Sequence, residues 1–208
     1  MLSSIARIYV CSVAGDTAAE RTILEGVVLP ELRQRATGLD LELETVDPGR
    51  AAQDWDLARR FELIQECRPF ALGIVGERYG DPPLQVPSEL TEQHLWLAAD
   101  PGRSVLELEL LEAVLNDPGA AWQSFFYLRD PAFASQVPES KRFAYQAESV
   151  KAAARLNYLK ERVRLSGRPV FDYPCGWSET LERPAHLDAF AARVTEDLWG
   201  AIEEEMEW

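Results

Sequence analysis

Short hydrophobic runs alternate with amphipathic stretches along the whole chain. Ala6 to Ser12, Phe70 to Val75 and Trp122 to Leu128 are rich in β-branched and aromatic residues and predict strands. Leu39 to Val46 alternates apolar and acidic residues, which is typical of an edge strand with one face in water. Arg168 to Tyr173 supplies a fifth candidate strand.

The stretches between these runs have the composition and apolar spacing of helices. They cover Thr17 to Arg35, Trp55 to Glu66, Ser104 to Asn116, Glu139 to Ser166 and His186 to Met206, with a short helix expected at Ser88 to Ala98. We expect Asp16 to cap the first of these helices and Pro30 to bend it.

Strands that alternate with helices favour a three-layer α/β fold, because parallel neighbours need helical crossovers that cover both faces of the sheet. We expect a flavodoxin-like, five-stranded parallel sheet of order 2-1-3-4-5 in one domain spanning residues 1–208. In such sheets a ligand binds outside the carboxyl ends of the strands, where the strand order reverses. That point lies between the first and third strands.

Composition excludes several classes of function. The chain has 208 residues, and its 35 acidic and 21 basic residues give a net charge of −14, which repels nucleic acid. Its apolar stretches are far shorter than the roughly 20 residues of a membrane-spanning helix, and its first residues do not resemble a signal peptide. We therefore expect a cytoplasmic protein that binds neither nucleic acid nor a membrane.

Cysteine and histidine are scarce. Cys11, Cys67 and Cys175 are too dispersed for a disulfide framework or a CxxC metal site, so reduced and partly buried thiols are expected. His94 and His186 have no neighbouring ligand types in the sequence. No metal site and no resident cofactor is therefore predicted.

Polar, glycine and aromatic residues gather where the predicted strands end. Loops are commonly polar, and glycine often ends a strand, so each residue taken singly is weak evidence for a site. The phosphate-binding P-loop, the Rossmann glycine motif and the GxSxG nucleophile elbow are all missing from the sequence. The candidate ligand-binding residues are Ser12, Gly15, Asp16, Glu77, Arg78, Tyr79 and Trp177, with Arg129 and Cys175 nearby in the same loops.

One predicted helix carries acidic residues within an apolar sequence. Its apolar side chains surround most of the circumference between Ser104 and Glu112, so Glu109 lies at the margin of a largely buried element. A carboxylate there needs either a salt bridge or a chemical task. Arg78 and Arg103 are the salt-bridge partners that we consider.

Six blocks of the chain resemble a known family in the family's own order. They are Arg7 to Arg21, Val28 to Arg33, Glu66 to Gly80, Ser104 to Pro118, Phe125 to Pro131 and Tyr173 to Trp177. These blocks resemble the N-terminal domain of STAND proteins of the nephrocystin and telomerase-associated-protein types, which is regarded as a divergent relative of TIR domains. The resemblance extends to the closing helix and so covers nearly the whole chain.

The resemblance implies a TIR-like, flavodoxin-like domain that is usually joined to a NACHT-type NTPase module and repeats. Such domains act as effectors or adaptors in signalling and defence, and members of the wider TIR group hydrolyse NAD with a glutamate in the helix after the third strand. Glu109 is the position that resembles this catalytic glutamate. A carboxylate near the sugar would stabilise the oxocarbenium-like state of glycosidic cleavage.

Three readings of the function stay open. The first is a non-catalytic module that acts by self-association or by binding a partner, including the NTPase and repeat domains. The second is an enzyme that cleaves NAD, or a related nucleotide sugar, with Glu109. The third is a nucleoside deoxyribosyltransferase-like enzyme. Leu106 replaces the family's usual threonine, the loop from Asp47 to Arg50 departs from the family pattern, and Asp81 stands where the family has a tryptophan.

Overall fold

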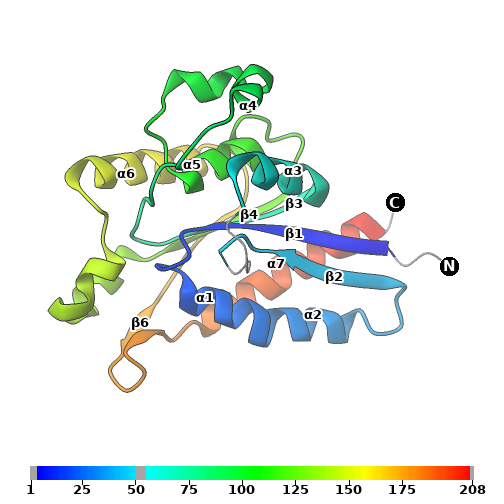
Figure 1. Cartoon of the computed structure of the whole chain (residues 1–208). Coiled ribbons are helices and arrows are strands. Elements are labelled where there is room, and N and C mark those ends of the chain that lie inside the picture. Colours follow the sequence, from blue (N-terminus) through cyan, green and yellow to red (C-terminus); the bar gives the residue numbers. More distant parts are fainter. Residues whose placement is uncertain (1–3, 50–54, 207–208) are drawn as a thin grey trace.

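A five-stranded parallel sheet forms the centre of the molecule. The computed structural model describes residues 4–49 and 55–206. The strands are β1 (Ser4–Ser12), β2 (Leu41–Val46), β3 (Phe70–Val75), β4 (Gln123–Arg129) and β5 (Val170–Tyr173). They pair in parallel in the order β2-β1-β3-β4-β5 (Figure 1). The predicted flavodoxin-like order is confirmed.

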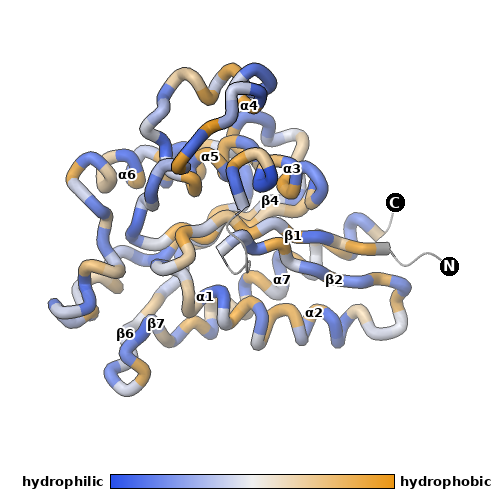
Figure 2. The backbone as a smooth tube through the Cα atoms, in the orientation of Figure 1, coloured by the Kyte–Doolittle hydropathy of each residue, from blue (hydrophilic) through white to orange (hydrophobic). Residues whose placement is uncertain are grey.

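Helices cover both faces of this sheet (Figure 1). On one face lie α1 (Ala18–Ile23), α2 (Leu29–Arg35) and α7 (Asp188–Met206), and on the other lie α3 (Leu57–Cys67), α5 (Val105–Leu110) and α6 (Val150–Arg164). Each face has its own hydrophobic core. Hydrophobic residues (orange) and hydrophilic residues (blue) alternate along each helix in Figure 2, because only one side of each helix packs on the sheet. All six residues of β3 are buried, as expected for a central strand covered on both faces.

The first predicted helix is interrupted in its middle. A π-helical segment, η1 (Leu24–Val28), separates α1 from α2. Pro30 lies in the first turn of α2, where its missing N–H is tolerated. The prediction that Asp16 caps this helix is wrong: Thr17 takes the cap position without a side-chain bond, while Asp16 accepts hydrogen bonds from the N–H groups of Glu77 and Arg78.

The long connection from β3 to β4 contains several short helices. The helix expected at 88–98 is divided into α4 (Ser88–Gln93) and a 3-10 helix, η2 (Leu95–Ala99), on either side of His94. The helix expected at 104–116 becomes α5 and a π-helical segment, η3 (Leu111–Leu115). Ser104 caps α5, because its Oγ accepts a hydrogen bond from the Glu107 N–H.

The helix predicted at 139–166 begins later than expected, and a short helix that was not predicted precedes it. Two 3-10 helices, η4 (Pro131–Gln136) and η5 (Glu139–Tyr145), precede α6, which begins only after Ser149 accepts a cap hydrogen bond from the Ala152 N–H. Pro131 and Pro138 at the start of each short helix favour such tight turns. After β5, an unexpected hairpin of β6 (Gly176–Ser178) and β7 (Arg183–Ala185) leads into α7.

Across residues 4–49 and 55–206, the structure has no helix long and apolar enough to cross a membrane. The same residues contain no group of three or more potential metal ligands.

Candidate functional site

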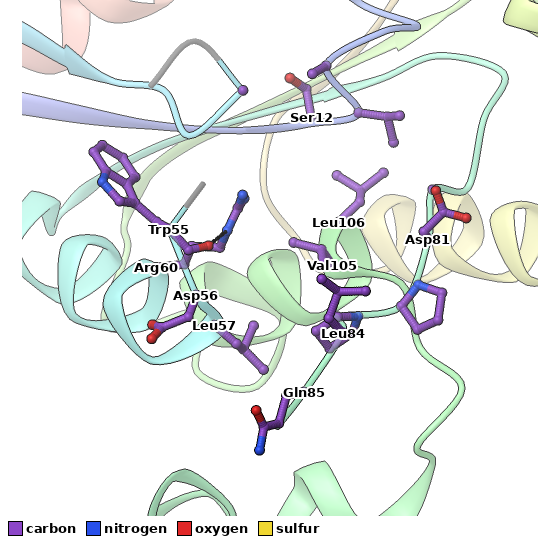
Figure 3. A pocket seen from close by; sticks show the side chains of 16 residues that line it. Ser12, Trp55, Asp56, Leu57, Arg60, Asp81, Leu84, Gln85, Val105 and Leu106 are labelled. Atoms are coloured by element: carbon purple, nitrogen blue, oxygen red, sulfur yellow. Dashed lines mark hydrogen bonds between the residues drawn. The ribbon is translucent and has the colours of Figure 1, made fainter. Parts of the chain in front are cut away.

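A pocket of about 510 Å³ opens at the carboxyl ends of β1 and β3, where the fold rule places a ligand. Its walls come from the loops after β1, β2 and β3 and from the first turns of α3 and α5. Figure 3 shows Trp55 and Arg60 on one side, Ser12 across from them, and Val105 and Leu106 from α5. Arg60 is the only cation among the lining residues that the structure describes.

Glu109 lies behind this pocket and does not line it. Its side chain is almost completely buried, and Oε1 accepts hydrogen bonds from the Tyr9 hydroxyl at 2.9 Å and from Arg60 Nη1 at 2.6 Å. Arg60 does line the pocket and is 15% exposed. One arginine side chain therefore contacts both the pocket and the buried carboxylate.

The expected salt bridge of Glu109 exists, but the two partners that we considered are wrong. Arg78 pairs with Glu148 and Arg103 pairs with Glu107. The true partner, Arg60, is on α3, which packs beside α5 on the same face of the sheet. The Arg60–Glu109 pair forms because α3 and α5 pack side by side on one face of the sheet. The spacing of residues along the chain does not indicate it.

Burial dominates the electrostatics of this site. It raises the pKa of Glu109, and Arg60 and Tyr9 oppose that shift without cancelling it. The pKa of Tyr9 is also raised, first by burial and then by the neighbouring Glu109 carboxylate. Glu109 is thus held in place by two donors and has no direct access to the pocket.

Ser12 lines the pocket, but its hydroxyl is already engaged. Its Oγ accepts hydrogen bonds from Arg21 Nη2 at 2.7 Å and Nε at 3.0 Å. The same guanidinium forms an ion pair with Asp47 at 3.1 Å, and a Cβ added to Gly49 would collide with it. Arg21 therefore ties the end of β1 to the loop after β2 and helps to form the pocket wall.

Asp16 belongs to a second, deeper cluster. Its Oδ1 is 2.6 Å from Arg129 Nη1, and Arg129 Nη2 is 2.6 Å from Glu20 Oε1, with all three side chains completely buried. The Tyr173 hydroxyl donates to the same Glu20 oxygen at 2.8 Å. Arg129 is therefore enclosed by protein groups and does not line the pocket.

The residues after β3 also bind to protein groups. Glu77 forms an ion pair with Lys160 at 3.2 Å, and burial raises the pKa of Glu77 although Lys160 opposes that shift. The buried Tyr79 hydroxyl donates to Glu107 and accepts from the Ser104 N–H. These contacts fix the loop after β3, and the pocket itself is lined by the next residues, Gly80 and Asp81.

Two predicted ligand residues lie away from the pocket. Gly15 is exposed, and a Cβ added there would have no atom within 4 Å. Trp177, on β6, packs against Phe133 and Tyr145 beside the core of the other face. Of the predicted residues, only Ser12 lines the pocket directly.

Trp55 and Arg60 are the pocket residues that sequence reasoning missed. The predicted ligand residues all follow a strand directly. A helix that follows a strand in this fold begins near the same edge of the sheet, so its first turns also face the ligand position. Arg60 lies in the first turn of α3, and Trp55 lies just before the Asp56 cap of that helix, so the residues around the start of the following helix carry the signal for both. Arg50, in the loop that departs from the family pattern, lies outside the described residues.

Comparison with known proteins identifies long relatives. Telomerase protein component 1 of Mus musculus is 29% identical over 96% of this chain, and its Rattus norvegicus counterpart is 28% identical over 95%. NACHT and WD repeat domain-containing protein 2 of Mus musculus is 27% identical over 67% of this chain. In each case the match spans about 8% of the relative's length. No family model and no solved structure matches the chain.

Proposed function

We propose that this chain is a TIR-like interaction domain of a STAND-type signalling or defence protein and that it acts without catalysis, by self-association or by binding a partner. The position of Glu109 carries the proposal. The side chain that would have to reach a substrate is buried and bonded to Tyr9 and Arg60, and it does not line the pocket.

The relatives support a role inside larger assemblies. The chain is similar to a short part of proteins whose names include NACHT and WD repeats or a telomerase component. Domains of this size fold as units within longer chains.

Exposed apolar side chains on the connection between β3 and α5 provide a surface to test. Leu84 and Leu95, both on the connection between β3 and α5, are among the most exposed large hydrophobic residues, and Val86 lies between them in the sequence. Such residues are more common at interaction sites when they are close together. We expect this segment to contribute to association.

Sedimentation velocity of the full chain at increasing concentration tests the proposal. We expect self-association that Leu84→Asp combined with Leu95→Asp weakens, because a charge at each position opposes burial in an interface. Leu165→Asp is the matched control, since Leu165 is equally exposed but follows α6. A chain that stays monomeric at every concentration and captures no partner would contradict the interaction role.

NAD cleavage is the second candidate, and one observation favours it. Arg60 binds Glu109 and also lines the pocket, so a ligand that contacts Arg60 lies one side chain away from the carboxylate. Incubating concentrated or artificially clustered protein with NAD and measuring nicotinamide release tests this function. Release that Glu109→Gln abolishes would establish catalysis and overturn the non-catalytic proposal. We expect no release from either protein.

A further inference from the structure

Four consecutive backbone N–H groups after β3 bind two carboxylates. Asp16 Oδ2 accepts hydrogen bonds from Glu77 N at 2.6 Å and from Arg78 N at 2.8 Å. Glu148 accepts from Tyr79 N at 3.3 Å and from Gly80 N at 3.0 Å. Gly80 has a positive φ of 85°, which curls the backbone in a way that glycine permits. Successive N–H groups in such a curl form an anion-binding concavity.

The two carboxylates differ in how firmly they are held. Asp16 is completely buried and also binds Arg129, so it is part of the interior. Glu148 comes from the connection between η5 and α6, and its side chain is 21% exposed. Water and small solutes can reach Glu148, whereas they cannot reach Asp16.

The donors around Glu148 form a set suited to a phosphate group. Besides the two N–H groups, Arg78 Nε is 2.9 Å from Glu148 Oε1, and the Arg78 side chain is 28% exposed. A guanidinium combined with backbone N–H groups is a common way to bind phosphate oxygens. Partial burial of Glu148 acts to raise its pKa. Hydrogen bonds from its own N–H, from Gly80 and from Arg78 outweigh that effect and lower the pKa of Glu148. The group that occupies these donors is therefore an anion.

We infer that the N–H groups of Tyr79 and Gly80, together with Arg78, form an anion site for the phosphate group of a small molecule, and that Glu148 is its internal occupant. A phosphate must displace Glu148 to bind, so the glutamate competes with phosphate for the site. Gly80 also lines the pocket, so the anion site and the pocket share this residue. This inference does not depend on the proposed interaction role, because it concerns binding alone.

Titration of the full chain with inorganic phosphate tests the inference. In Glu148→Ala we expect phosphate to bind at least about tenfold more tightly than in the unchanged chain, because the internal competitor no longer reduces the fraction of open sites. Calorimetry measures the affinity, and the amide NMR signals of Tyr79 and Gly80 should shift with phosphate. Adding Arg78→Ala to Glu148→Ala should remove the gain.

Glu139→Ala is the control for charge, since it removes one exposed carboxylate from the preceding segment without opening the loop after β3. It should bind phosphate as weakly as the unchanged chain. Equal affinity in Glu148→Ala and Glu139→Ala would overturn the inference, as would tighter binding of acetate than of phosphate.

Glu148→Gln is a second variant for the case in which the loop after β3 loses its order when Glu148 is replaced by alanine. Glutamine keeps an acceptor of the same shape but lacks the charge that attracts Arg78, so we expect a phosphate affinity between those of the unchanged chain and Glu148→Ala. If the glutamine variant stays folded and phosphate shifts neither the Tyr79 nor the Gly80 signal, the site does not exist.

Discussion

Two arginines at the same edge of the sheet each bind buried carboxylates, but their surroundings differ. Arg129 is completely enclosed between Asp16 and Glu20, and its guanidinium carbon is 4.9 Å from the centre of the Phe133 ring. Arg60 binds Glu109 and remains 15% exposed at the pocket wall. One arginine is part of the interior, and the other lies between the interior and the solvent.

This difference in exposure distinguishes the Arg129 cluster, which only supports the fold, from the Arg60 pair, which a ligand can reach. The Arg129 cluster joins the loop after β1, helix α1, β4 and the Tyr173 end of β5, so it fixes the carboxyl edge of the sheet. The Arg60 pair joins α3, α5 and Tyr9 of β1, and a ligand in the pocket could reach the arginine directly. Of these two clusters, the Arg60 pair is the one that a ligand in the pocket can contact.

Removing Arg129 should give the largest effect. Arg129→Met leaves Asp16 and Glu20 buried without their cation, and we expect a loss of about 3–5 kcal/mol in the free energy of unfolding. Denaturant unfolding at neutral pH measures it. The matched control is Arg164→Met, because Arg164 pairs with Asp172 at the surface and should lose less than about 1 kcal/mol. Equal losses in the two variants would show that the buried cluster has no special role.

Removing Arg60 should give a smaller effect that depends on pH. Arg60→Met leaves the Glu109 carboxylate with Tyr9 as its remaining side-chain donor, and we expect a loss of about 2 kcal/mol at neutral pH. Loss of the cation raises the pKa of Glu109 further, so the deficit should shrink as the pH falls and the carboxyl group becomes protonated. Unfolding measured over a series of pH values tests this. A deficit that is constant with pH would mean that the arginine acts through packing alone.

Neutralising Glu109 should have the smallest effect at neutral pH and a clear effect on the pH profile. Burial raises the pKa of Glu109 above its ordinary value of 4.5, so its contribution to stability is complete below that pH and is lost as the pH rises through the folded-state pKa. Glu109→Gln removes this loss while keeping an acceptor for Tyr9 and Arg60. We expect its unfolding free energy to fall less than that of the unchanged chain as the pH rises.

The exposed Glu161 supplies the control for that profile. Glu161→Gln removes the same charge from an exposed position, so its profile measures what the loss of one surface charge does by itself. If Glu109→Gln and the unchanged chain had parallel profiles, the carboxyl group of Glu109 would have to be ionised in the folded state as easily as in the unfolded chain.

The pattern of the sequence was sufficient to predict the layers of the fold. The apolar run at Phe70–Val75 and the alternation from Leu39 to Val46 identified a central and an edge strand, because side-chain periodicity follows directly from backbone geometry. The helix at 139–166 was overestimated, since composition does not reveal that a 3-10 helix follows Pro138 and that the α-helix begins only at Val150.

The sequence by itself determined the strand order, the edge of the sheet where the pocket lies, and the presence of an acidic residue that needs a partner in a buried helix. Only the tertiary structure decided which partner each charge takes. Arg60 reaches Glu109 from 49 positions away, and Arg129 reaches Asp16 from 113 positions away. Local periodicity is set by bonds within each segment, whereas these ion pairs depend on how separate segments pack on a common sheet.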